Sequence, residues 1–215
     1  MNAPDTAAAL FDLVSPTPSA PLPEGRARRL LLAVSALLAS VALAGLWGLA
    51  ANAGLPEALA NGLKVPMLLA VSGVASLPIT LLAWKLVGGA RGRATDLVLA
   101  YGAAVFGGTM VLALLAPIVA LYQHSSAWAG PWIALGSAAC GFVVACALFV
   151  RALRRLIGDA PLRGVLFPVA LLAVTQLATL GQLAAVTTPV FGQRTAFGRG
   201  IDALAPARVE GEAAR

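Results

Sequence analysis

Five long apolar runs without a charged residue divide this chain. The first, LLLAVSALLASVALAGLWGLA from Leu30 to Ala50, is about as long as a helix that crosses some 30 Å of hydrocarbon. Four similar runs follow: the stretch between Lys64 and Lys85, then residues 97–121, 132–150 and 165–186. The pattern predicts an all-α fold, a polytopic transmembrane helix bundle with about five spans.

The segments outside these runs differ from them in composition. Residues 1–28 hold four prolines between positions 16 and 23, among Ser, Thr and Ala, which neither favours a helix nor builds a core. We expect a flexible cytoplasmic tail there. The predicted organisation is a tail at 1–28, a five-span bundle at 29–190 and a polar C-terminal tail at 191–215.

The overall composition supports a membrane protein. Hydrophobic residues make up 60% of the chain and charged residues 11%, against roughly a quarter charged in an ordinary soluble domain. The net charge of +6 comes from small clusters of Lys and Arg between the apolar runs, not from one basic groove. We therefore expect membrane lipids as partners and no nucleic acid.

The basic clusters predict the orientation. Ten Lys or Arg residues flank the spans on one side of the predicted membrane, whereas the short loops on the other side hold only Lys64. By the positive-inside rule we expect the N-terminus in the cytoplasm and, after five spans, the C-terminus outside. The expected location of the protein is the inner membrane of the cell. The topology signals are Arg26, Arg28, Arg29, Lys85, Arg91, Arg93, Arg151, Arg154 and Arg155, with Arg163 as the tenth.

An alternative for the first run is a cleaved signal peptide. Basic residues precede the run, and Ala51-Asn52-Ala53 after it resembles a small-x-small cleavage site. The run exceeds the usual 7 to 15 residues of a signal peptide, so we expect it to be retained as a span.

The chain lacks the residue patterns of an active site. An ionisable group inside a span is the usual mark of a proton relay or a coupled transporter. The predicted spans contain none. His124, the single histidine, has no carboxylate nearby in sequence, and Cys140 and Cys146 fall on different faces of one helix. We expect no enzyme activity, no cofactor and no metal.

Small and polar residues inside the spans predict helix packing. Small residues four apart allow backbones to approach closely, and hydroxyls or amides turn away from lipid. The candidate packing residues are Gly73, Ala103, Gly107, Ser137 and Gly141, and the candidate polar interior comprises Ser76, Thr80, Gln176, Thr179 and Gln182. Two functions remain open for the polar residues: they join helices within the bundle, or they line a ligand pocket or pathway.

The tail segment AAALFDLV, residues 7–14, has the periodicity of a short amphipathic helix. Leu10, Phe11 and Val14 fall near one face, with Asp12 opposite. Two interpretations remain: a transient apolar patch, or a motif that docks on a partner protein.

The chain resembles the bacterial Yip-type five-span membrane proteins over residues 30 to about 205. In similar relatives the fifth span often ends in a stretch rich in aromatic residues, with an Arg before a Pro-Phe pair. This chain reads AAVTTPVFGQR there, so the match is partial. The resemblance implies membrane organisation or trafficking for eukaryotic members and little for bacterial ones. The matching features are Lys64-Val65-Pro66, Leu77-Pro78, Ala116-Pro117, Gln176, Gln182 and Thr188-Pro189-Val190-Phe191-Gly192.

Two functional hypotheses follow from these patterns. The first is a non-enzymatic scaffold or accessory subunit of a membrane complex. The alternative is a small uncoupled permease or channel subunit. Many transporters consist of two inverted repeats, and an odd number of spans does not divide into two whole repeats.

Overall fold

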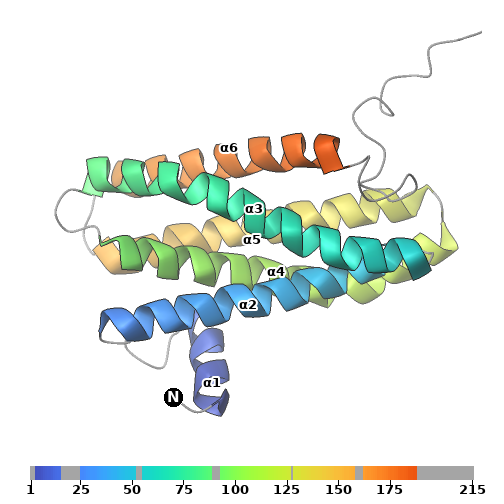
Figure 1. The fold of residues 1–215 in the computed structure, drawn as a ribbon, viewed down its shortest axis with the longest axis horizontal. Coiled ribbons are helices and arrows are strands. Elements are labelled where there is room, and N and C mark those ends of the chain that lie inside the picture. The colour runs from blue at the N-terminus through green and yellow to red at the C-terminus, as the bar shows by residue number, and fades with distance from the viewer. Residues whose placement is uncertain are drawn as a thin grey trace, which may run out of the picture.

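The computed structural model describes residues 3–15, 25–51, 55–88, 93–126, 128–157 and 162–187. These residues form helices joined by short connections, and the all-α fold is confirmed (Figure 1). The helices are α1 (Ala3–Val14), α2 (Arg26–Ala50), α3 (Leu55–Gly88), α4 (Ala94–Ser125), α5 (Ala129–Ile157) and α6 (Leu162–Thr187).

Five of these helices are long and apolar enough to cross a membrane, in agreement with the five predicted runs. They lie side by side and alternate in direction along the bundle (Figure 1). The chain is therefore a multi-pass membrane helix bundle. The candidate spans are Arg26–Ala50, Ala58–Leu86, Ala94–Ser125, Ala129–Leu156 and Gly164–Gln182.

Helix α4 is the central helix of the bundle. It contacts α2 and α5 extensively, while α3 bridges α2 and α6. Every residue of α4 from Tyr101 to Thr109 is buried. The segment YGAAVFGGT explains this, because small residues on all its faces let neighbouring helices approach.

The second span differs from its predicted bounds. Helix α3 begins at Leu55, well before the apolar run, and its candidate span already includes Lys64. The residues LPEALANGLK are mostly good helix formers, and Pro56 fits the first turn of a helix. Lys64 therefore lies inside helix α3 and does not mark its end, in contrast to the prediction.

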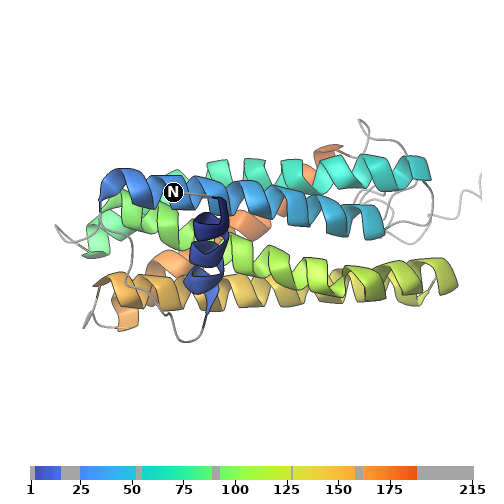
Figure 2. The same ribbon diagram turned by 90° about the horizontal axis from the view of Figure 1, so that it is seen from below.

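The N-terminal segment also differs from the expected flexible tail. Residues Ala3–Val14 form helix α1, which packs on α2 and α4 (Figure 2). The four prolines lie after this helix, whereas its own sequence is rich in alanine. A composition averaged over residues 1–28 does not reveal this helix-forming segment, and residues 16–24 lie outside the described residues. The predicted tail at 191–215 lies outside the described residues.

Candidate functional site in the polar interior

A stripe of polar side chains runs along the inner face of α3. Asn61, Lys64, Ser72, Ser76 and Thr80 all have an exposed fraction of 0%. Their spacing keeps them near one face of the helix, which turns toward the other helices and away from lipid.

The hydroxyl groups in this stripe are satisfied by their own helix. Ser72 donates a hydrogen bond to the carbonyl of Leu69 at 3.0 Å, Ser76 to Ser72 at 2.7 Å, and Thr80 to Ser76 at 2.8 Å. Such bonds remove the cost of burying a hydroxyl without a partner on another helix. Ser76 and Thr80 thus lie in the interior with their polar groups paired locally.

Gln176 links α6 to the centre of the bundle. Its side chain is 8% exposed and shares a hydrogen bond with the side chain of Tyr101 in α4. The Tyr101 hydroxyl lies directly over Gly73 of α3, where a Cβ atom would come within 2.4 Å of it. Three helices therefore meet at Gly73, Tyr101 and Gln176, and only glycine leaves room for the phenol.

The other predicted polar residues of α6 lie toward its flank. Thr179 is half-buried and donates a hydrogen bond to the carbonyl of Thr175 at 2.7 Å, and Gln182 is exposed. The structure thus differs from the expectation that Gln182 faces the interior. The reason is angular: six residues of helix place Gln182 about 120° from Gln176, so both cannot face α4.

The lysine and asparagine of the stripe were missed as candidate residues by the sequence analysis. Lys64 and Asn61 lie one turn apart on α3. Neither the nitrogen nor the oxygen of the Asn61 amide has a hydrogen-bond partner among the described residues, although the side chain is fully buried. A buried amide of this kind calls for a water or a ligand. The signal that could have revealed them was the spacing of positions 61, 64, 68, 72 and 76.

The helices approach most closely beside this pair. A Cβ atom on Gly48 of α2 would come within 2.4 Å of the Asn61 carbonyl oxygen, and one on Gly45 within 3.1 Å of the Gly62 oxygen. Glycines in α2 therefore hold the backbones of α2 and α3 together at the level of Asn61 and Lys64.

The remaining candidate packing residues lie on α4 and α5. Ala103, Gly107, Ser137 and Gly141 are buried. A Cβ atom on Gly107 would come within 2.1 Å of Leu148, and one on Gly141 within 2.9 Å of the Gly108 oxygen. Gly107 and Gly141 therefore permit the tight contact between the two helices.

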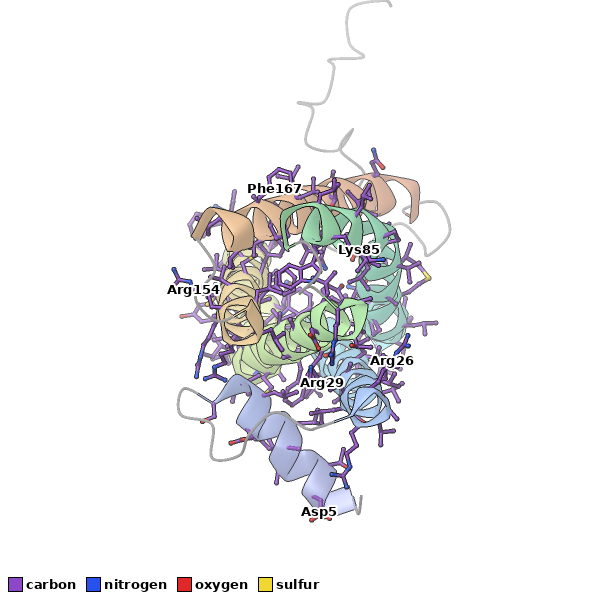
Figure 3. All side chains as sticks on the ribbon, turned by 90° about the vertical axis from the view of Figure 1, so that its left-hand side faces the viewer. Asp5, Arg26, Arg29, Lys85, Arg154 and Phe167 are labelled. Atoms are coloured by element: carbon purple, nitrogen blue, oxygen red, sulfur yellow. The ribbon has the colours of Figure 1, made fainter. Side chains whose placement is uncertain are left out.

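The basic topology residues gather at one end of the bundle. Arg26 and Arg29 begin α2, Lys85 ends α3, and Arg154 lies in the last turn of α5 (Figure 3). Arg29 forms a partly buried salt bridge with Asp96 in the first turn of α4. Arg28, Arg93 and Arg155 are exposed at this end, Arg151 is half-buried, and Arg91 lies outside the described residues.

Within the described ranges, no group of three or more His, Cys, Asp or Glu residues is placed to hold a metal ion. Cys140 is exposed on α5 and Cys146 is half-buried. His124 is exposed near the end of α4.

The fold and this interior define the chain as a multi-pass α-helical membrane protein. No protein-family model, curated protein or solved structure matches it.

Proposed function

We propose that this protein is a non-enzymatic scaffold or accessory subunit of an inner-membrane complex, with its N-terminus in the cytoplasm. The observation that carries the proposal is the contact of Gln176 with Tyr101 over Gly73. The polar groups there hold α3, α4 and α6 together and need no solute as a partner.

The outer surface of α5 is consistent with this role. Only 22% of its candidate span is buried within the chain, against 44% for α4. Leu135, Val143 and Cys140 are exposed there. This surface is available to lipid or to the helix of another subunit.

The test is photo-crosslinking in native membranes. We attach a benzophenone maleimide to the exposed Cys140 in a chain with Cys146→Ser, and compare it with a Cys140→Ser chain labelled at Cys146. If the protein is a scaffold, the label at Cys140 is expected to give one discrete adduct to a single other membrane protein. That protein is also expected to co-purify with the chain at a fixed ratio. Adducts to lipid alone, together with a chain that purifies by itself, would overturn the proposal.

A permease or channel subunit is the second candidate, and the Asn61–Lys64 pair favours it. An ionisable residue inside a span marks a functional site by default. The ammonium group of Lys64 and the amide of Asn61 lie one turn apart on α3, and both groups can donate hydrogen bonds to a small anion. The solute would then be an anion and not a cation.

Proteoliposomes test this second candidate. We measure efflux of chloride, formate and acetate from vesicles that contain the intact protein, Lys64→Met, or the matched exposed control Lys85→Met. A permease is expected to raise efflux of at least one anion several-fold over empty vesicles, with loss in Lys64→Met only. Efflux equal to that of empty vesicles for all three anions would remove the support that Lys64 gives this candidate.

A further inference from the structure

Helix α1 lies crosswise to the five long helices. Both ribbon views show it running across the side of the bundle and not along its axis (Figures 1 and 2). If the long helices cross the membrane, a helix in this position lies in the plane of the membrane. Amphipathic helices that rest at a membrane interface have this orientation.

One face of α1 is fixed to the bundle. Leu10 is 8% exposed and packs in a cluster with Leu32 and Ala33 of α2 and Phe106 of α4. Val14 lies against Gly107, where a Cβ atom would come within 3.1 Å of its side chain. The apolar residues of the predicted docking motif thus contact their own bundle.

The position of α1 along the bundle is given by its contact with Arg151, the first charged residue after the apolar run of α5. The run from Trp132 to Val150 has no charge, and Arg151 comes next. The guanidinium of Arg151 donates a hydrogen bond to the carbonyl of Ser15, directly after α1. The C-terminus of α1 therefore lies at the boundary between the apolar and the charged parts of α5. Asp12 interacts electrostatically with Arg155 one turn further along α5.

The open face of α1 is the flank that carries Ala8 and Phe11. Phe11 is 56% exposed, although its ring lies edge-on to Phe106 with 6.1 Å between the centroids. Ala8 is exposed as well. The exposed cations Arg26, Arg28 and Arg154 lie at the same end of the bundle, where anionic lipid headgroups are attracted to positive charge.

We propose that α1 is an in-plane membrane helix and that the partner of its open face is the lipid bilayer. Phe11 inserts among the acyl chains beside the bundle, at the level where Arg151 meets the headgroups. The C-terminal turn of α1 is held by Arg151 and Arg155 of α5, so its polar end is satisfied at the boundary. This arrangement does not depend on the scaffold or the permease function.

Spin-label accessibility in the full chain tests the proposal. In a Cys140→Ser and Cys146→Ser background, single cysteines are introduced by Phe11→Cys, Ala8→Cys and Asp5→Cys, labelled with a nitroxide and reconstituted into vesicles of phosphatidylethanolamine and phosphatidylglycerol. Collisions with oxygen, which concentrates among acyl chains, are compared with collisions with a water-soluble nickel chelate. Asp5 is exposed and serves as the aqueous reference.

The label at position 11 is expected to collide several-fold more with oxygen than with nickel, relative to the label at position 5. Equal nickel accessibility at positions 11 and 5 would place the helix in water and overturn the proposal. Shielding from both reagents would mean that a protein covers the face, which overturns it as well. A Phe11→Trp chain gives an independent measurement, because its additional emission is expected to be quenched by brominated lipid and not by aqueous iodide.

Discussion

Trp47 of α2 donates a hydrogen bond to Ser137 of α5, with 3.0 Å between the indole Nε1 and the hydroxyl oxygen. The two side chains are 2% and 5% exposed. Ser137 in turn donates to the carbonyl of Ala134 at 2.7 Å. Both helices pack on α4, so this bond joins the two neighbours of the central helix to each other.

Replacing Trp47 by Phe is expected to destabilise the bundle by about 1 kcal/mol, because it keeps an apolar ring but removes the donor, and hydrogen bonds between membrane helices contribute up to about 1.7 kcal/mol. The measurement is the free energy of unfolding in detergent micelles. Trp128→Phe is the matched control, since Trp128 is 78% exposed. Equal effects of the two substitutions would show that the bond contributes nothing.

Gly73→Ala is expected to destabilise the protein, because the new Cβ atom would lie 2.4 Å from the Tyr101 hydroxyl. Gly136→Ala is the control: nothing lies within 4 Å of its Cβ position, and alanine should stabilise that helix by up to about 1 kcal/mol. Tyr101→Phe removes the clashing oxygen. A Gly73→Ala chain that is not improved by Tyr101→Phe would contradict this account, as measured by unfolding of the single and double variants.

The number and type of the long helices could be predicted from sequence because uncharged runs of this length are specific to membrane spans. Charge alone did not fix their ends. The charge pattern predicts a loop at Lys64, yet α3 begins at Leu55 and its helix-forming residues continue through Lys64. Periodicity identifies the faces of a helix but not which one turns inward. The position of Tyr101 over Gly73 decides that Gln176, and not Gln182, faces the centre.

Asn61→Leu is expected to stabilise the purified, ligand-free protein by about 1 kcal/mol or more, since it removes a buried amide whose two polar atoms lack a described partner. Ser72→Ala is the control, because the Ser72 hydroxyl is already bonded to Leu69 and its loss should change stability little. Thermal unfolding of both variants provides the comparison. A destabilised Asn61→Leu chain would contradict the view that the unpaired amide costs stability.

The distribution of basic residues predicts the topology. A reporter that is active only in the cytoplasm is expected to work when fused after Arg93 or Arg155 and to fail after Gly54 or Ser126, because the positive-inside rule predicts that the basic ends of the helices are cytoplasmic. Enzyme activity of each fusion in intact cells is the measurement. Identical activity after Arg93 and Ser126 would contradict the five-span arrangement.

Gln176 and Gln182 form a matched pair on one helix. Gln176→Leu leaves the hydroxyl of Tyr101, which is 3% exposed, without its partner and is expected to cost about 1 kcal/mol of stability. Gln182→Leu changes an exposed amide that the bundle does not use, so it is expected to cost nothing or to stabilise the chain in lipid. Adding Tyr101→Phe to Gln176→Leu removes the orphaned hydroxyl and should recover most of the loss. If Gln182→Leu proved the more damaging of the two, the inward face of α6 would be the one that carries Gln182, and the contact of Gln176 with Tyr101 could not be what joins α4 to α6.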